Sequence, residues 1–408
     1  MSVSYPKEKI NILLLENISV EAVTELNQSG YTNITTLKGA LSEDELIARM
    51  SDVHVLGIRS KTQITEAILA AAPKLLAIGC FCIGTNQVDK LAAMKQGVVV
   101  FNAPYSNTRS VAELVIGAAI MLIRRIPEKN KAAHEGIWLK ASANSRELRG
   151  KILAIIGYGN IGSQVSVLAE ALGMHILFYD VEKKLPLGNA TALYDLESVL
   201  QQADIVTLHV PATKQTTNLI NEATLKQFKP GALLINYSRG EVVAIDALHE
   251  ALKTGALSGA ALDVYPVEPE RNGADFHTPL QGLKNVLLTP HIGGSTEEAQ
   301  VNIGLDVSAK LISFIEHGST QGSHSVPALS LPLQEGAHRI LHIHHNVPGV
   351  LSAINTTLSA NGINILGQYL KTNDVIGYVV LDVDKNLSGE ALSLLKNVKE
   401  TIRVRMVY

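Results

Sequence analysis

The stretch 151-KILAIIGYGNIGSQVSVLAEALG-173 joins an apolar strand pattern to a helical pattern through a glycine-rich turn. This context gives the spacing of Gly157, Gly159 and Gly162 its meaning, because a lone glycine motif is weak. Gly157 permits the tight turn, and Gly159 lets the backbone approach a pyrophosphate. Gly162 lets the helix pack closely on the strand. The stretch therefore predicts a doubly wound α/β sheet with a dinucleotide site.

The helix that follows the turn begins near Asn160 and Ile161, where unpaired N–H groups and partial positive charge favour phosphates. Asp180 ends the next strand pattern, eighteen positions after Gly162. A carboxylate there can accept hydrogen bonds from a ribose diol and would repel a 2′-phosphate, so we expect NAD rather than NADP. The alternative is a packing loop followed by a surface aspartate.

Further strand patterns lie on both sides of this stretch and alternate with helical patterns, which predicts parallel sheets with crossover helices. Those before it are residues 10–15, 53–58, 75–78 and 98–101, and those after it are 175–179, 205–209, 232–236, 259–263 and 286–288. One long helix is expected from about Ser110 through Lys131, and another from about Thr296 to His317. The fold class is thus two doubly wound domains, a flavodoxin-like one followed by a Rossmann-type one.

The tail follows a Ser-, Pro- and Gly-rich linker and has the order strand, helix, strand, strand, helix, strand, which is a ferredoxin-like βαββαβ unit. We expect a substrate-binding domain of residues 1–103 and 294–317, a nucleotide domain of 104–293, a linker of 318–335 and a tail domain of 336–408.

Composition fits a soluble enzyme of several domains. The chain has 408 residues, 46% of them hydrophobic, and a net charge of −3. No nucleic-acid partner, secretory signal or membrane span is expected, and the location should be cytoplasmic. Cys80 and Cys82 are expected to be small buried hydrophobes rather than a disulfide or a metal pair.

Three further motifs, 236-NYSRG-240, 262-LDVYPVEP-269 and 289-TPHIGG-294, together with the glycine turn, resemble the signatures of D-2-hydroxyacid dehydrogenases. The resemblance covers about residues 10–317. It implies that Arg239, Glu268 and His291 are catalytic. It also implies the following cofactor neighbours: His209, Val210, Pro211, Tyr237, Ser238, Asp263, Gly293 and Gly294.

These three residue types suit the reaction independently of the resemblance. The guanidinium of Arg239 can hold a carboxylate with a planar fork. His291 can exchange a proton near neutral pH, and a neighbouring Glu268 would favour the imidazolium and fix its tautomer. Taken singly they could be a surface arginine, a solvated glutamate and a loop histidine. Each, however, follows a strand pattern at the edge where doubly wound sheets bind ligands.

The loops 56-LGIRSK-61 and 102-NAPYSNTRSVAE-113 resemble those of the phosphoglycerate-oxidising members of this family. The resemblance implies that 3-phospho-D-glycerate is oxidised to 3-phosphohydroxypyruvate, the first step toward serine, with possible reduction of 2-oxoglutarate. The implied substrate residues are Arg59, Ser60 and Asn107, with Lys38, Lys61 and Gln300 as helpers. Relatives often carry arginine in place of Lys61. Alternatives are a glycerate, lactate or formate dehydrogenase, or a corepressor-like NAD sensor.

Residues from about His338 to Tyr408 resemble an ACT domain, a module that binds amino acids. The segments 342-HIHHNVPGVL-351 and 361-NGINI-365 resemble serine-binding segments of feedback-inhibited relatives, which implies L-serine as effector. The effector residues would be His344 and Asn346 of one subunit and Asn364 of its neighbour, in a homotetramer. Relatives often carry arginine in place of Val347. A metal site at the histidines and a dimerisation module without ligand are the alternatives, and no metal is expected.

Overall fold

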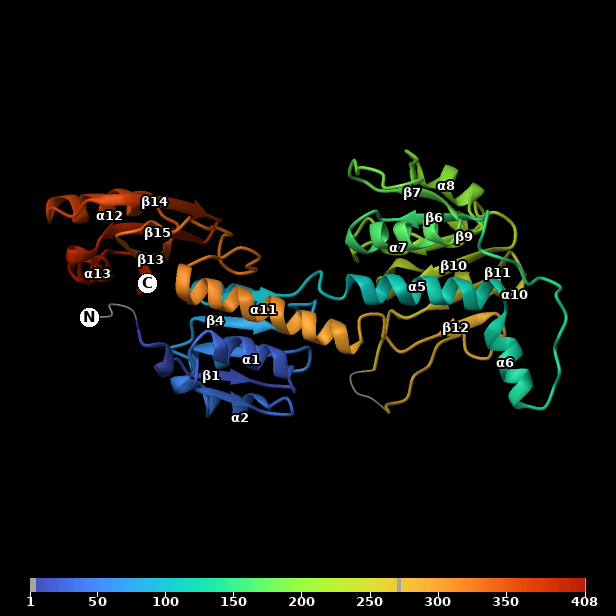
Figure 1. The fold of residues 1–408 in the computed structure, drawn as a ribbon, viewed down its shortest axis with the longest axis horizontal. Coiled ribbons are helices and arrows are strands. Elements are labelled where there is room, and N and C mark those ends of the chain that lie inside the picture. Colours follow the sequence, from blue (N-terminus) through green and yellow to red (C-terminus); the bar gives the residue numbers. More distant parts are fainter. Residues whose placement is uncertain (1–4, 270–272, 408) are drawn as a thin grey trace. The chain divides into compact units, whose positions relative to one another are not determined.

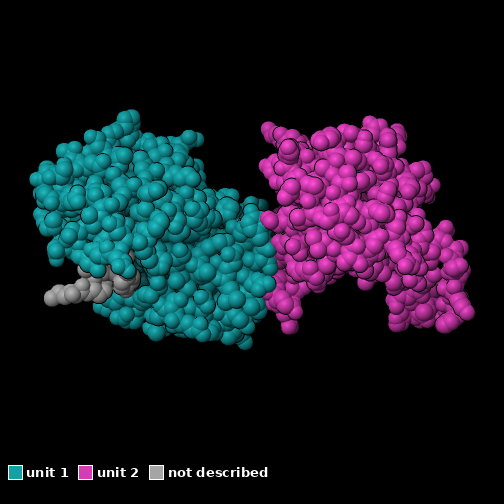
Figure 2. All heavy atoms as spheres, turned by 45° about the horizontal axis from the view of Figure 1, so that its top comes forward, with its two compact units in different colours: residues 1–106, 300–408 teal, residues 107–299 magenta. Residues whose placement is uncertain are grey.

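The computed structural model describes residues 5–269 and 273–407. The chain divides into two compact units (Figures 1 and 2). Unit 1 consists of residues 1–106 and 300–408, and unit 2 consists of residues 107–299. The tail predicted as a separate domain belongs to unit 1. The domain boundaries expected from the sequence stay a prediction.

Unit 1 begins with a five-stranded parallel sheet of order β2-β1-β3-β4-β5, the flavodoxin-like order. The strands are β1 (Ile12–Leu14), β2 (Ile34–Thr36), β3 (Val55–Ile58), β4 (Ala77–Cys80) and β5 (Val99–Asn102). The helices are α1 (Val20–Gln28), α2 (Glu43–Ile47), α3 (Glu66–Ala70), α4 (Lys90–Lys95) and α11 (Glu297–His317), with the 3₁₀ turns η1 (Lys7–Lys9) and η2 (Met50–Asp52). The predicted fold class is confirmed here, although β2 has no counterpart among the predicted strands.

Side chains before several of these helices satisfy the free N–H groups of the first turn. Ser19, Thr65 and Asp89 accept hydrogen bonds from Ala22, Ile68 and Ala92 respectively. Such N-caps stabilise the helix starts, because a helix end otherwise leaves its first N–H groups without partners. Because Ser19, Thr65 and Asp89 follow β1, β3 and β4, these helix starts lie at the carboxyl edge of the sheet.

Unit 2 holds a seven-stranded parallel sheet of order β12-β11-β10-β9-β6-β7-β8. Its strands are β6 (Ile152–Ile156), β7 (His175–Tyr179), β8 (Thr191–Ala192), β9 (Ile205–Leu208), β10 (Ala232–Asn236), β11 (Leu257–Leu262) and β12 (Val286–Leu288). Its helices are α5 (Thr108–Ile123), α6 (Ile126–His134), α7 (Asn160–Ala171), α8 (Leu196–Gln202), α9 (Glu222–Leu225) and α10 (Ile245–Lys253), with η3 (Gly240–Val242). One hydrophobic core packs α5 and α7 against the sheet, and a second core packs α8, α9 and α10 against it. This sheet is therefore also doubly wound.

The single long helix expected from Ser110 through Lys131 is wrong. The structure has two helices, and Arg125 between them has a left-handed backbone with φ of 55°. Pro127 lies in the first turn of α6, where its missing N–H costs no hydrogen bond. No glycine marks this break, and the glutamate, lysines and alanines that follow it favour a helix, which is why the sequence suggested a single one.

The tail forms a four-stranded antiparallel sheet of order β14-β15-β13-β16, and the predicted βαββαβ unit is confirmed. It consists of β13 (Ala337–His345), α12 (Val350–Ala360), β14 (Ile365–Thr372), β15 (Ile376–Asp384), η4 (Lys385–Leu387), α13 (Ser388–Lys396) and β16 (Thr401–Val407). The two helices pack on one face of the sheet.

The other face of the tail sheet packs into the first core of unit 1. Leu341, Ile343 and Tyr378 share one buried cluster with Leu14 of β1 and Phe314 of α11. Burial of this kind is worth roughly 1.5–3 kcal/mol for each large apolar side chain. The tail and the N-terminal sheet therefore complete a common core.

Buried arginines reinforce this packing. Arg339 forms a bidentate ion pair with Asp382 at 2.8 and 2.9 Å. Arg405 donates to the carbonyls of Phe314 and Ile315, near the end of α11, and stacks over the Phe314 ring with 4.5 Å to its centroid. Burial lowers the pKa of the Arg405 guanidinium to about 10. A cation at a helix C-terminus is favourable because the last carbonyls lack intrahelical partners.

The segment 318–335, expected to be a linker, is anchored to the edge of the first sheet. The hydroxyl of Ser325 accepts from the Val100 amide and donates to the Val98 carbonyl. His324 adds a backbone bond to the Val100 carbonyl. Ser325 is 2% exposed, so this part of the chain is packed rather than free.

Within residues 5–269 and 273–407, no helix is both long and apolar enough to cross a bilayer.

Candidate functional site

The glycine turn between β6 and α7 has the geometry that its sequence predicts. Gly157 has φ of 93°, and a methyl group built on it would lie 2.4 Å from the His209 carbonyl oxygen. A methyl group on Gly162 would lie 2.2 Å from the Gly157 oxygen. Gly159, the N-cap of α7, is different, because a methyl group there meets no described atom within 4 Å. The space at Gly159 is the open cradle that a pyrophosphate needs.

Asp180 follows β7 and is attached directly to this turn. One of its carboxylate oxygens accepts the Tyr158 amide at 2.7 Å, and the other accepts the Glu182 amide at 2.9 Å. The side chain remains partly exposed, so each oxygen keeps a lone pair for a ribose hydroxyl. The turn, the first amides of α7 at Asn160 and Ile161, and the carboxylate together fit a dinucleotide.

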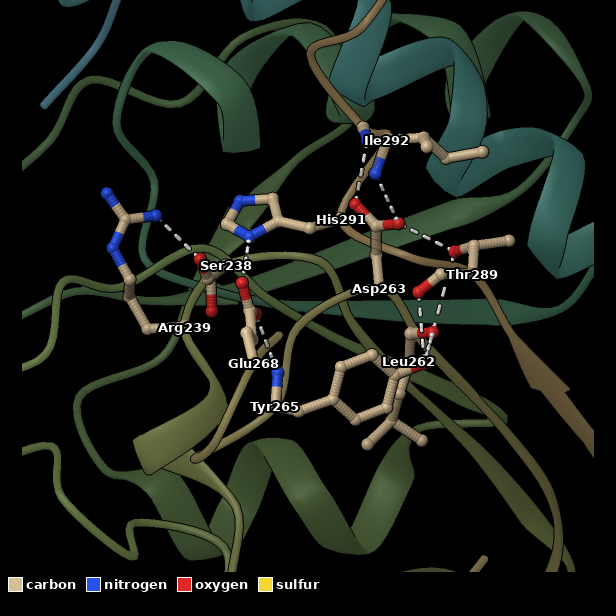
Figure 3. A network of polar contacts seen from close by, with 10 residues as sticks. Ser238, Arg239, Leu262, Asp263, Tyr265, Glu268, Thr289, His291 and Ile292 are labelled. Atoms are coloured by element: carbon tan, nitrogen blue, oxygen red, sulfur yellow. Dashed lines mark hydrogen bonds and ion pairs between the residues drawn. The ribbon is translucent and has the colours of Figure 1, made fainter. Parts of the chain in front are cut away.

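Arg239, Glu268 and His291 follow three neighbouring strands of unit 2, namely β10, β11 and β12. Nδ1 of His291 lies 2.7 Å from Oε2 of Glu268 (Figure 3). The other carboxylate oxygen of Glu268 accepts the Tyr265 amide at 3.0 Å, which fixes its orientation. His291 is half exposed, with 53% of its side-chain surface accessible. The ring is therefore held at Nδ1 while Nε2 stays free for a reactant.

Arg239 is exposed, and its Nη1 donates to the Ser238 carbonyl at 2.6 Å. Its backbone carbonyl accepts the Asn236 side-chain amide, which also binds the amide and hydroxyl of Ser238 through its oxygen. The remaining guanidinium N–H groups can take a carboxylate in the planar arrangement that arginine favours. The catalytic roles of these residues remain proposals.

Asp263, expected beside the cofactor, binds the loop that carries His291. Oδ1 accepts the Ile292 amide at 2.8 Å and the Thr289 hydroxyl at 2.7 Å, and Oδ2 accepts the Gly293 amide at 2.7 Å (Figure 3). His291 itself has φ of 54°. A buried carboxylate thus holds the loop around His291 in a backbone conformation that non-glycine residues seldom adopt.

The other expected cofactor neighbours lie along the same edge of unit 2. Burial lowers the pKa of His209 to about 3, so its ring is neutral, with Nε2 3.0 Å from the Thr207 hydroxyl. Val210 lies against Gly157, and the Pro211 carbonyl accepts from the Thr216 hydroxyl. Burial also raises the pKa of Tyr237 to about 12. Gly294 leaves room for the side chain of Asn107, since a methyl group there would lie 2.1 Å from Nδ2.

The expected substrate residues are divided between the units. Asn107 lies in unit 2, whereas Lys38, Arg59, Ser60, Lys61 and Gln300 lie in unit 1. Arg59 to Lys61 follow β3, and Lys38 follows β2, so these cations occupy the carboxyl edge of the first sheet. Gln300 lies in the first turn of α11. Arg59 is partly exposed, and Lys38, Ser60 and Lys61 are exposed.

The expected effector residues lie at one end of the tail sheet. His344 is the penultimate residue of β13 and is buried, and its Nδ1 lies 2.8 Å from the His345 carbonyl oxygen. Asn346 donates to the Asn373 carbonyl at 2.6 Å, and Asn364 is exposed before β14. No group of three or more metal-ligating side chains that could hold an ion occurs in the described ranges. Both cysteines are free thiols, and Cys80 is buried.

Comparison with known proteins shows the family to which the chain is similar. The family "D-isomer specific 2-hydroxyacid dehydrogenase, NAD binding domain" matches residues 116–293, and the "AHAS small subunit-like ACT domain" matches residues 340–405. The D-3-phosphoglycerate dehydrogenase of Haemophilus influenzae is 52% identical over 100% of this chain and 99% of its own length. The enzyme of that name from Dictyostelium discoideum is 50% identical over 99% of each chain.

Among solved structures, the D-lactate dehydrogenase of Aquifex aeolicus, complexed with NAD and lactic acid, is 28% identical with a TM-score of 0.62. The match covers 75% of this chain and 95% of that one. The chain therefore belongs to the D-3-phosphoglycerate dehydrogenases within the D-isomer specific 2-hydroxyacid dehydrogenase family, and it is an NAD-dependent enzyme.

Proposed function

We propose that this chain oxidises 3-phospho-D-glycerate to 3-phosphohydroxypyruvate with NAD, as the first step toward serine. The observation that carries the proposal is the 2.7 Å contact between Glu268 and His291. The exposed Arg239 follows β10, the strand next to the one that Glu268 follows. A 2-hydroxyacid presents a hydroxyl proton and a carboxylate, and these residues offer a base and a cation for them. The names of the full-length relatives supply the choice of phosphoglycerate.

Oxidation removes a proton from the hydroxyl oxygen and a hydride from the carbon that bears it. Nε2 of His291 takes the proton, because Nδ1 is occupied by Glu268, which stabilises the imidazolium that forms. Arg239 holds the carboxylate and orients the carbon. The glycine turn and Asp180 would hold NAD, which when bound would supply the acceptor for the hydride.

Recognition of the phosphate is assigned to the cations on the carboxyl edge of the first sheet. In the described part of the chain, neither Arg59 nor Lys61 forms an ion pair, so both charges can meet an anion. Ser60 adds a hydroxyl between them. Charge-assisted bonds to phosphate are about twice as strong as neutral ones. Lys38, Asn107 and Gln300 are assigned supporting roles.

A substrate panel followed by NADH absorbance tests the proposal. The panel contains phosphohydroxypyruvate, hydroxypyruvate, pyruvate and 2-oxoglutarate in the reductive direction, and formate with NAD in the oxidative one. We expect phosphohydroxypyruvate to give the largest kcat/KM. Replacing Arg59 with alanine should lower that value at least tenfold, whereas Arg49→Ala, an exposed control before β3, should not. Equal rates with and without the phosphate would refute the assignment, and no turnover would favour the NAD-sensor alternative.

Feedback inhibition by L-serine is the regulatory part of the proposal. It is supported by the ACT match and by the polar groups of His344, Asn346 and Asn364. Deleting residues 336–408 would be a poor test, because Leu341 and Tyr378 belong to the core of unit 1. Turnover with millimolar serine in the unaltered chain and in His344→Ala is cleaner. Serine should inhibit only the former, and insensitivity of the unaltered chain would end this part.

A homotetramer and a cytoplasmic location are further parts of the proposal. The exposed apolar side chains Ile137, Trp138 and Leu139 support self-association, since such patches often mark interfaces. Light scattering after size-exclusion chromatography gives the mass directly. Four times the chain's 43.8 kDa is expected, and a monomer would contradict it.

A further inference from the structure

Glu16 lies between the loops that carry the cations of unit 1, in a backbone conformation that glutamate rarely adopts. It follows β1 by two residues, has φ of 61° and is 7% exposed. Asn17 is also left-handed, with φ of 55°. Two consecutive residues of this kind cost free energy, so the surrounding contacts must hold them there.

The Glu16 side chain supplies those contacts to the loop after β3. Oε1 accepts the amides of Arg59 at 3.1 Å and Thr62 at 2.9 Å, and Oε2 accepts the amide of Lys61 at 3.0 Å. A carboxylate bound by three N–H groups is a strong anchor, because charged acceptors form the stronger hydrogen bonds. These bonds involve only the backbone amides, so the charged side chains of Arg59 and Lys61 are not used by Glu16 and can bind another group.

The backbone of the same segment holds the turn after β2. The Glu16 amide donates to the Gly39 carbonyl at 3.2 Å, and the Asn17 amide donates to the Leu37 carbonyl at 3.1 Å. These two carbonyls flank Lys38. Strands β1, β2 and β3 are neighbours in the sheet, and Glu16 ties their three carboxyl ends together.

The loop after β3 is fixed from its other side as well. The side-chain amide of Gln87 donates to the Arg59 carbonyl at 2.7 Å. Ile64 pairs with Val88 in an isolated parallel bridge, with Ile64 N to Gln87 O at 2.7 Å. Only the side chains of Arg59, Ser60 and Lys61 are left to project from a backbone held at both ends.

We propose that Glu16 is a positioning residue for phosphate recognition, which sets the spacing between Lys38, Arg59 and Lys61. The inference rests on the proposed function, because it assigns the phosphate to these cations. It explains why a buried acid stands beside a site that binds an anion. The carboxylate accepts hydrogen bonds from backbone amides, so it positions the cationic residues instead of neutralising their side chains.

The test replaces Glu16 with glutamine, which keeps the shape but puts an NH₂ group against an amide N–H. Losing one charge-assisted bond corresponds to roughly ten- to a hundredfold in binding. We expect KM for phosphohydroxypyruvate to rise at least tenfold, with kcat within about twofold and KM for hydroxypyruvate nearly unchanged. A general loss of fold would move all three values and the NADH affinity together.

Asp204→Asn is the matched control. Asp204 is also nearly buried and also accepts a backbone amide, that of Ile152 at 2.9 Å, but it lies at the amino edge of the unit 2 sheet. This variant should leave the ratio of the two KM values as in the unaltered chain. If Glu16→Gln fails to fold, Gln87→Leu decides, since it frees the Arg59 carbonyl and should raise the same KM selectively.

The outcomes separate the two levels of inference. An unaltered chain with no preference for the phosphorylated substrate overturns the proposed function. A preference that survives in folded Glu16→Gln, or in Gln87→Leu where the first does not fold, overturns the positioning role alone.

Discussion

Nδ1 of His291 lies 2.7 Å from Oε2 of Glu268, although the backbone of His291 is left-handed with φ of 54°. The conformation is imposed by Asp263, which binds the amides of Ile292 and Gly293 just after the histidine. Backbone strain of this kind typically costs about 1–3 kcal/mol and persists where surrounding contacts enforce it. The ring is thus placed by the main chain as much as by its carboxylate partner.

Replacing His291 with asparagine should abolish most turnover without unfolding the loop. Asparagine tolerates the left-handed region better than alanine does, so the strain is not confounded with the chemistry. General acid–base catalysis is worth about 10²- to 10⁴-fold, and we expect kcat to fall by at least that much. NADH fluorescence titration should give an unchanged Kd. Near-normal turnover would remove His291 from the mechanism.

Two glycine substitutions should separate cofactor binding from folding. Gly159→Ala puts a methyl group into open space, so thermal stability should be kept while NADH binding weakens at least tenfold, because the phosphates lose their close approach. Gly162→Ala puts a methyl group 2.2 Å from the Gly157 oxygen, so stability itself should fall. Differential scanning fluorimetry with NADH titration distinguishes the two. Equal melting temperatures for both variants would contradict the steric argument.

Asp180→Asn should weaken NADH binding and narrow the preference for NADH over NADPH. The amide keeps the size of the side chain but offers one acceptor oxygen to the Tyr158 and Glu182 amides and to a ribose. Losing bonds to a charged group corresponds to about 1.5–3 kcal/mol, or roughly ten- to a hundredfold in Kd. Titration with both nucleotides checks this. An unchanged ratio of the two Kd values would argue against ribose recognition by Asp180.

Acid should destabilise the tail through His342. Burial, and then the charge of His344, lower the pKa of His342 to about 4 from its ordinary value of 6.5. The unfolded chain therefore binds more protons, so stability falls as pH drops below 6.5 and stops falling through this group below about 4. Between pH 7 and pH 5 the loss should be about 2 kcal/mol.

The variant His342→Gln removes this titration. Its side chain can still reach the Thr401 hydroxyl, which His342 contacts at 2.9 Å. Denaturant unfolding at both pH values should show a smaller loss in the variant than in the unaltered chain. Since other histidines contribute equally to both proteins, an identical loss would show that the pKa of His342 does not differ between the folded and unfolded states.

The long apolar runs and the motifs predicted most of the fold, because buried parallel strands leave a continuous apolar signal. Strand β2 was missed because only Ile34 of its three residues is even partly buried, so no pattern marks it. The break at Arg125 was missed because no glycine marks it and most residues beyond it, apart from Pro127, are ordinary helix formers. Pro127 was the available signal for that break.

The site was predictable to the level of which residues follow which strands. The conformation of His291 was not, because it results from the bonds of Asp263 across some thirty positions of sequence. Glu16 was missed entirely, since it belongs to no motif and its partners are backbone amides 43 to 46 positions away. An acid that directly follows a buried apolar run, as in 12-ILLLE-16, is the one cue that the sequence offers.

The shared core of unit 1 has a consequence for how the chain is made. Leu14 emerges early from the ribosome, yet its cluster includes Phe314, Tyr378 and Val407, which emerge last. Residues 107–299 form their own cores and can mature while the nascent N-terminal sheet still exposes apolar surface. During translation, chaperones should therefore bind mainly to the first hundred residues. A premature stop within the tail strands would release a chain whose N-terminal sheet cannot complete its hydrophobic core.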